Sequence, residues 1–181
     1  LLKDARFIER MFDQDASLWT EDSESQLEIQ KRLGWLFLPK TSRDLVPEIY
    51  QFRDEIIADG YDTVALMGMG GSSLAPELYQ VVFGRNNQLQ LLVLDSTDPD
   101  QVRRISRQIN PKKTMFIVSS KSGGTAEVNA FLAYFWERTR KSVKVDAGKH
   151  FAAITDPGTS LEKTALARNF RKIFFADPTV G

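Results

Sequence analysis

Five short apolar runs alternate with helical stretches in the second part of the chain, and this alternation restricts the fold more than any other feature. The runs predict strands at residues 62–67, 89–94, 114–118, 151–154 and 172–176. The segments between them, residues 74–83, 98–109, 125–140 and 160–170, have the apolar spacing of helices. This pattern predicts an α/β fold, a doubly wound five-stranded parallel sheet with helices on both faces.

The residues before this alternation predict a helical appendage. Apolar residues fall at helical spacing from Ala5 to Phe12 and again from Leu27 to Leu33. Thr41-Ser42 is expected to open a longer helix that runs to about Asp59, with Gly60 as the stop. We therefore predict an N-terminal helical segment over residues 1–40 and the main α/β domain over residues 41–181.

The composition excludes several functional classes. Lys plus Arg and Asp plus Glu number 24 each, so no global charge attracts nucleic acid or a membrane surface. With no cysteine and one histidine, a disulfide framework, a thiol nucleophile and a metal site rich in these residues are excluded. No apolar run approaches the roughly 20 residues of a membrane span, and the N-terminus lacks a signal-peptide pattern, so a cytoplasmic protein is expected. We expect no metal and no cofactor.

The two ends of the chain suggest a domain cut from a longer polypeptide. The sequence begins at Leu1 rather than at methionine, and it stops shortly after the last predicted strand. We therefore expect a missing C-terminal domain of the same polypeptide as one partner.

Two turns rich in glycine and serine each join a predicted strand to a helix: GMGGSS at residues 68–73 and SSKSGGTAE at residues 119–127. In the second turn, three side chains offer hydroxyl donors, glycines allow close backbone approach, and the helix start adds free N–H groups. Taken alone, this turn equally fits a polar loop with a capping serine. Both turns follow strands of one parallel sheet, so they are expected at the same edge, where such sheets bind ligands.

Two ligand classes fit these turns. GMGGSS matches the first two glycines of a dinucleotide fingerprint, and Asp95 stands where a ribose-binding acid is expected, but Ser73 occupies the third small position. A nicotinamide-dependent enzyme is therefore one hypothesis. The favoured ligand is a small-molecule phosphate monoester between the turns, contacted by the hydroxyls of residues 120, 122 and 125 and by Ser72 with the backbone of residues 70–71.

The paired motifs carry a family resemblance. GMGGSSLAPE followed by SSKSGGTAE resembles the two motifs of the sugar isomerase (SIS) domain family and, within it, of the glucose-6-phosphate isomerases. The final ADPTVG resembles the start of that family's V-G-G-R-[FY]-S segment, and the resemblance covers about residues 45–181. LGWLFLP and ITDPGTSLEK further resemble the isomerase half of a fused transaldolase–glucose-6-phosphate isomerase.

The resemblance implies a flavodoxin-like SIS fold and an isomerase of glycolysis and gluconeogenesis. Such enzymes interconvert glucose 6-phosphate and fructose 6-phosphate through a cis-enediol, without a cofactor, and commonly as homodimers. The implied phosphate-binding residues are Ser120, Lys121, Ser122 and Thr125, and the implied substrate-binding residues are Gly71 and Ser72.

The family's catalytic glutamate, histidine, lysine and arginine match no position of this chain. His150 is predicted at the start of the fourth strand, on the sheet edge opposite the site, and is expected to be structural. Glu127 is expected to interact with the positive end of the helix that it begins, and Asp95 is expected to be a turn residue. We therefore expect a fragment that binds the sugar phosphate without catalytic residues; the alternative is a non-catalytic sugar-phosphate sensor or regulatory domain.

Overall fold

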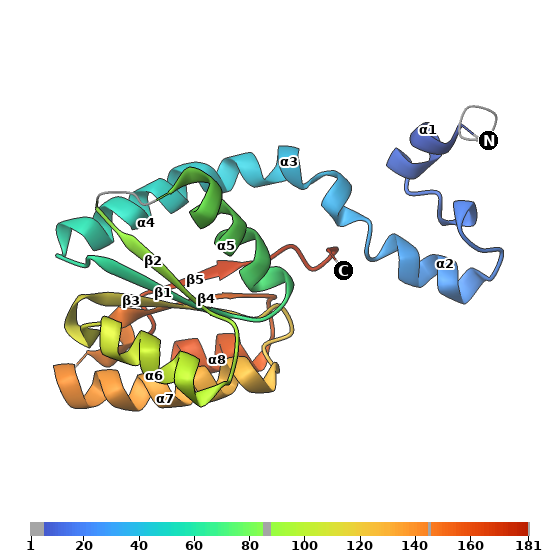
Figure 1. Cartoon of the computed structure of the whole chain (residues 1–181). Helices are drawn as coiled ribbons and strands as arrows, with labels where there is room; N and C mark the ends of the chain where they lie inside the picture. The colour runs from blue at the N-terminus through green and yellow to red at the C-terminus, as the bar shows by residue number, and fades with distance from the viewer. Residues whose placement is uncertain (1–5, 85–87, 145, 181) are drawn as a thin grey trace. The chain divides into compact units, whose positions relative to one another are not determined.

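The computed structural model describes residues 6–84, 88–144 and 146–180, and the chain divides into two compact units. One unit comprises Leu1–Tyr50 and Asp177–Gly181, and the other comprises Gln51–Ala176. Figure 1 shows the second unit as a central sheet between layers of helices. The predicted boundary between residues 40 and 41 stays a prediction.

The larger unit is built on five parallel strands in the order β2-β1-β3-β4-β5. Their bounds are β1 Thr63–Gly68, β2 Gln90–Leu94, β3 Thr114–Ser119, β4 Phe151–Thr155 and β5 Lys172–Phe175. All four pairings are parallel. The predicted five-stranded parallel sheet is confirmed, and each predicted strand lies within one residue of the observed one at either end.

This strand order places the switch point of the sheet between β1 and β3. The chain leaves β1 toward β2 on one side and then crosses to β3 on the other. In the register between these strands, Gly68 pairs with Ser119, so their last residues are direct neighbours. Ligands of doubly wound sheets bind beyond the carboxyl ends of the strands at such a point.

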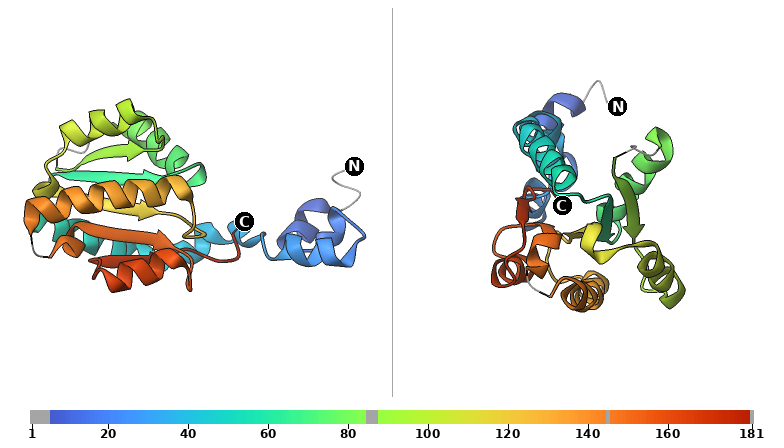
Figure 2. Two further views of the ribbon diagram at one scale, coloured as in Figure 1. Left: turned by 90° about the horizontal axis from the view of Figure 1, so that it is seen from below. Right: turned by 90° about the vertical axis from the view of Figure 1, so that its left-hand side faces the viewer.

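Helices cover both faces of the sheet, as predicted (Figures 1 and 2). One face carries α5 (Gly71–Phe83) and the part of α4 (Val46–Ala58) that belongs to this unit. The other face carries α6 (Pro99–Gln108), α7 (Ala126–Val143) and α8 (Ser160–Ala167).

Alternation along the strands fills both layers of the core. In β3, Met115 packs with Phe52 and Ile56 of α4, whereas the next residue, Phe116, packs on the other side of the sheet. Phe116 stacks there on Phe151 with ring centroids 4.9 Å apart. The sheet therefore holds the ends of β1 and β3 between two packed layers.

The helix after β1 begins earlier than predicted. It starts at Gly71 rather than at residue 74, because Gly70 turns the chain with φ 55° and ψ −121°. The N–H of Leu74 donates to the Gly70 carbonyl at 3.0 Å, which closes the first turn. Pro76 consequently lies inside the helix, where its ring nitrogen has no hydrogen to donate.

The smaller unit is helical, as predicted, although Ala5, where the expected helical spacing begins, lies outside the described residues. It contains α1 (Phe7–Phe12), α2 (Ser23–Gln30), α3 (Leu38–Thr41), the start of α4, and the 3-10 turns η1 (Ala16–Leu18), η2 (Gly34–Leu36) and η3 (Ser42–Leu45). The helix start expected at Thr41-Ser42 is wrong for the α-helix: Thr41 ends α3, Ser42 begins the 3-10 turn η3, and α4 begins only at Val46.

The last described residues pack within this smaller unit. The N–H of Gly34 donates to the Thr179 carbonyl at 2.9 Å, and Leu33 forms an antiparallel bridge with Val180. Within the three described ranges, no helix has both the length and the apolar character needed to cross a membrane.

Candidate functional site

The first turn, between β1 and α5, is built almost entirely from glycine backbone. Gly68 cannot carry a side chain, because a Cβ there would lie 2.9 Å from the Cβ of Ser72. A Cβ on Gly70 or Gly71 would meet nothing within 4 Å. The backbone of residues 70–71 is therefore open on its outer side.

The two serines of this turn differ in role. Ser73 is buried, and its hydroxyl donates to the Gly70 carbonyl at 3.1 Å, so it closes the turn. Ser72 is half-buried, and within the described part of the chain its hydroxyl has no hydrogen-bond partner. Ser72 is thus the hydroxyl of the first turn that is left for a ligand.

The second turn begins inside the sheet and ends at the start of α7. Ser120 is 4 % exposed, and its N–H donates to the Ile154 carbonyl of β4 at 3.0 Å. Its hydroxyl lies 3.0 Å from the hydroxyl of Thr125. Two of the four predicted phosphate-binding side chains are therefore in direct contact.

Thr125 occupies the N-cap position of α7 without capping it. Its side chain makes no hydrogen bond to the N–H groups of the first turn. The side chain of Thr125 therefore does not cap α7. The positive end of an 18-residue helix lies beside the paired hydroxyls of Ser120 and Thr125, where an anion is favoured.

Lys121 points toward the loop after β4. Its ammonium forms an ion pair with Asp156, and its carbonyl accepts from the N–H of Asp156 at 3.1 Å and from the hydroxyl of Thr155 at 3.3 Å. The positive charge thus already has a carboxylate partner. The backbone of Lys121, rather than its ammonium, is the part that adjoins Ser120.

The remaining predicted residue, Ser122, is exposed. Its hydroxyl accepts from the N–H of Gly124 at 3.3 Å and so supports the turn in the present conformation. A Cβ on Gly124 would meet only that hydroxyl, at 4.0 Å, so the backbone here is open.

Gly123 serves packing rather than ligand approach, which corrects the expectation for this glycine. It has φ +68° and is buried, and a Cβ would lie 2.7 Å from the Cβ of Thr159 and 2.9 Å from the backbone nitrogen of Leu161. The hydroxyl of Ser160 donates to its carbonyl at 2.7 Å. The start of α8 therefore braces the second turn, a contact that no local pattern in the sequence indicated.

Comparison with known proteins identifies the family of this chain. Residues 56–181 match the family described as phosphoglucose isomerase. The chain belongs to the phosphoglucose isomerase family. Curated relatives include the glucose-6-phosphate isomerases of Thermus thermophilus, 30% identical over 149 residues, and of Carboxydothermus hydrogenoformans, 31% identical over 160 residues. Each alignment covers 82% of this chain but only 35% and 34% of the relative, so the chain spans about a third of their length.

Solved structures show the same fold. A hypothetical protein of Thermus thermophilus superposes with a TM-score of 0.79 at 27% identity, over 99% of this chain and 40% of that one. A glucose-6-phosphate isomerase of Chlamydia trachomatis superposes with a TM-score of 0.69 at 22% identity, over 94% of this chain and 31% of that one.

Three titratable residues that are not among the candidate site residues have structural surroundings in this member of the phosphoglucose isomerase family. His150 precedes β4, at the amino end of the strand and opposite the turns, as predicted. Its ring packs edge-on against Tyr61 with centroids 5.2 Å apart, and burial lowers the pKa of His150 and raises that of Tyr61. Asp95 accepts from the side-chain amide of Gln101 at 3.0 Å, and Glu127 lies in the first turn of α7.

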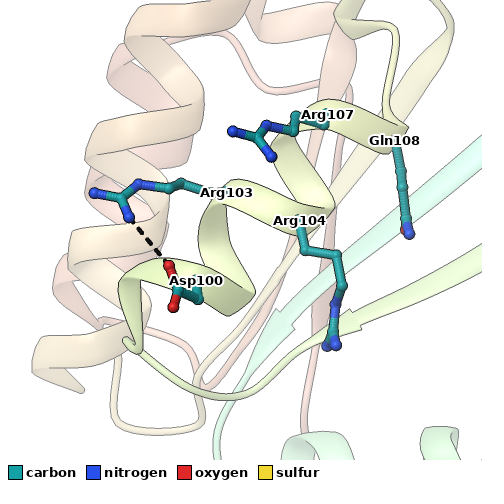
Figure 3. A pocket seen from close by; sticks show the side chains of 5 residues that line it. All are labelled: Asp100, Arg103, Arg104, Arg107 and Gln108. Carbon is teal, nitrogen blue, oxygen red and sulfur yellow. Dashed lines mark hydrogen bonds and ion pairs between the residues drawn. The ribbon is translucent and has the colours of Figure 1, made fainter.

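A separate hollow of about 440 Å³ lies on α6, and none of the candidate site residues lines it. Its lining residues are Asp100, Arg103, Arg104, Arg107 and Gln108 (Figure 3). Arg103 is paired with Asp100 at 3.0 Å, and Arg104 points to a different side of the helix from Arg103 and Arg107. The three guanidinium groups therefore do not converge on one point.

Proposed function

We propose that this chain is the sugar-phosphate-binding part of a glucose-6-phosphate isomerase. Membership of the phosphoglucose isomerase family and the names of the relatives support the enzyme class. The observation that carries the proposal is the pair of hydroxyls of Ser120 and Thr125, 3.0 Å apart at the uncapped start of α7 and at the switch point of the sheet.

The substrate's phosphate binds at the second turn. Ser120, Ser122 and Thr125 donate hydroxyl hydrogen bonds, and the backbone N–H of Lys121 and the first turn of α7 add further donors. On binding, the hydroxyls of Ser120 and Thr125 exchange their mutual hydrogen bond for bonds to the phosphate oxygens.

The sugar extends from there toward the first turn. Gly68 and Ser119 are register partners on adjacent strands, and neighbouring strands lie about 4.8 Å apart. With that spacing, Gly71 and the hydroxyl of Ser72, which has no hydrogen-bond partner among the described residues, can reach the hydroxyls of a hexose phosphate.

The complete enzyme interconverts glucose 6-phosphate and fructose 6-phosphate through a cis-enediol. It acts in glycolysis and gluconeogenesis, in the cytoplasm. No residue of this sequence matches the family's catalytic glutamate, histidine, lysine or arginine, so the fragment binds without turnover. A C-terminal domain of the same polypeptide supplies these groups. The motifs LGWLFLP and ITDPGTSLEK further support a parent protein fused to a transaldolase, which the complete gene sequence tests.

The second candidate is a non-catalytic sugar-phosphate sensor or regulatory domain. It is favoured by one observation: the turns offer hydroxyl groups, whereas Asp95 is already hydrogen-bonded and His150 lies at the opposite sheet edge. The two candidates differ in the complete polypeptide, which turns over glucose 6-phosphate only if it is the isomerase.

Titration calorimetry tests the binding proposal on the chain as it stands. We expect heat of binding with glucose 6-phosphate and fructose 6-phosphate and none with glucose, because the phosphate supplies the charged acceptor. Titration with NAD is the control for the dinucleotide hypothesis. A folded chain that binds neither sugar phosphate, or that binds only NAD, would contradict the proposal.

A further inference from the structure

The segment from the end of β4 to the start of α8 holds the backbone of the second turn at three places. Ser120 donates its N–H to this segment, and Lys121 and Gly123 accept hydrogen bonds from it at their carbonyls. The carbonyl of Lys121 accepts twice, from the N–H of Asp156 at 3.1 Å and from the hydroxyl of Thr155 at 3.3 Å. The orientation of the peptide group that follows Lys121 is therefore fixed from β4.

This peptide group presents its N–H on the opposite side. The described residues contain no cis peptide bond, and in a trans peptide the C=O and the N–H point in opposite directions. Because the carbonyl of Lys121 points to the β4 segment, the N–H of Ser122 points away from it. Ser122 is exposed, and within the described part of the chain its N–H has no hydrogen-bond partner. A backbone donor is thus held ready in the same turn as the paired hydroxyls of Ser120 and Thr125.

The hydroxyl of Thr155 is the last link in a chain of hydrogen bonds that run in one direction. Its single hydrogen goes to the carbonyl of Lys121, because a carbonyl only accepts. The contact of 2.8 Å between the hydroxyls of Thr155 and Thr159 is therefore donated by Thr159. The hydroxyl of Thr159 in turn accepts from the N–H of Glu162 at 3.2 Å. Successive hydrogen bonds of this kind polarise one another, so the chain strengthens the N–H of Ser122 as a donor.

Packing alone does not require a hydroxyl at position 155. Thr155 ends β4 and is fully buried, so its side chain reaches no ligand. A valine has nearly the same shape and would fill the same space without needing a hydrogen-bond partner. The hydroxyl therefore acts through the carbonyl of Lys121.

We propose that Thr155 is a positioning residue of the phosphate site. Its hydroxyl fixes the peptide group between Lys121 and Ser122, so that the N–H of Ser122 donates to an oxygen of the phosphate. The inference rests on the proposed function and adds to it a residue that does not touch the ligand.

Titration calorimetry with glucose 6-phosphate tests this role on the intact chain. Thr155→Val should weaken binding by about threefold to tenfold, the effect of one hydrogen bond. Thr114→Val is the matched control, because Thr114 is also fully buried and its hydroxyl donates to the carbonyl of Asn110 at 2.8 Å, at the amino end of β3. Both variants lose a buried hydroxyl from the same sheet, but Thr114→Val should keep the affinity of the unmodified chain.

The conservative variant Thr155→Ser separates the hydroxyl from the rest of the side chain. Serine keeps the hydroxyl and loses only the methyl group, so it should retain most of the affinity that Thr155→Val loses. Urea denaturation of all three variants shows whether they are folded and how much stability each has lost.

Nuclear magnetic resonance of the isotope-labelled chain reports on the N–H of Ser122 directly. Saturation with inorganic phosphate should shift the amide proton signal of Ser122 downfield in the unmodified chain and in Thr114→Val. The shift should be smaller in Thr155→Val at saturation, because the N–H is then less well aligned. A general loss of stability would not produce this difference.

The possible results distinguish this inference from the proposed function. An unmodified chain that binds neither glucose 6-phosphate nor inorganic phosphate overturns both. If the unmodified chain binds, the inference alone is overturned by equal affinity in Thr155→Val, by equal losses in the two valine variants, or by an equal loss in Thr155→Ser. An amide signal of Ser122 that phosphate does not shift in the unmodified chain overturns it as well, whether or not Thr155→Val folds.

Discussion

The two glycine-rich turns at the switch point are similar in sequence and differ in support. The first turn, at Gly68–Ser73, is held by its own backbone and by the hydroxyl of Ser73. The second turn, which follows Ser119, is held by β4, by Asp156 and by the start of α8.

Under the proposed function, this difference gives the two turns different tasks. A group held rigidly before binding loses less conformational freedom when the ligand arrives, so the second turn suits the charged phosphate. The first turn leaves two glycine backbones and the Ser72 hydroxyl unobstructed, which suits the neutral hydroxyls of the sugar. The following predictions test this division, from the largest expected effect to the smallest.

Substituting Gly123 should have the largest effect. Gly123→Ala forces a residue with φ +68° to carry a Cβ that clashes with Thr159 and with the backbone of Leu161. We expect a loss of about 2–5 kcal/mol in the free energy of unfolding, measured by urea denaturation. Gly70 of the first turn also has a positive φ, but a Cβ there would meet no neighbouring atom. The variant Gly70→Ala should therefore lose only about 1–3 kcal/mol of the free energy of unfolding. Equal losses would contradict the difference in support.

Removing the paired hydroxyls should weaken binding without unfolding the chain. In the double variant Ser120→Ala, Thr125→Ala, each lost charge-assisted hydrogen bond should cost about 1.5–3 kcal/mol in the binding of glucose 6-phosphate. The free energy of unfolding should change little, because both partners of one hydrogen bond disappear together. Calorimetry measures the first quantity, and Thr125→Ser, which keeps the hydroxyl, is the control. Unchanged affinity in the double variant would remove this turn from the site.

Removing the Lys121 ammonium should have a smaller effect on binding. Lys121→Ala breaks the ion pair with Asp156, and the lysine side chain is 40% exposed, so we expect a loss of about 1 kcal/mol or less in stability. Affinity for glucose 6-phosphate should fall less than in the Ser120, Thr125 double variant, since the backbone N–H of residue 121 remains. A larger loss of affinity would show that the ammonium itself binds the phosphate.

Changing the arginines of α6 should have no effect on ligand binding. Arg104→Ala with Arg107→Ala removes two positive charges from the hollow in Figure 3, which contains none of the candidate residues. The affinity for glucose 6-phosphate should stay unchanged in calorimetry at low salt. Weaker binding in this variant would place the phosphate, or its electrostatic attraction, at α6 instead of at the two turns.

The sequence by itself determined the fold class and the sheet edge at which the candidate residues lie. Short apolar runs between helical segments predicted the five strands to within one residue at either end. This was possible because the pattern of side chains along a strand depends only on neighbouring residues. The position of each motif after a strand then placed both turns at one sheet edge, where Gly68 and Ser119 are paired. These inferences depend only on neighbouring residues and on general rules for parallel sheets.

Only the tertiary structure decided how the two turns are supported and which way α5 faces. The partner of Lys121 is Asp156, 35 residues further along the chain, and the residues that enclose Gly123 begin another helix. The spacing of the apolar residues in α5 predicts an apolar face, but it does not show whether that face meets the sheet or points away from it, as it does here. Such contacts join segments that are distant in sequence, and packing across the whole sheet, rather than any local preference, determines them.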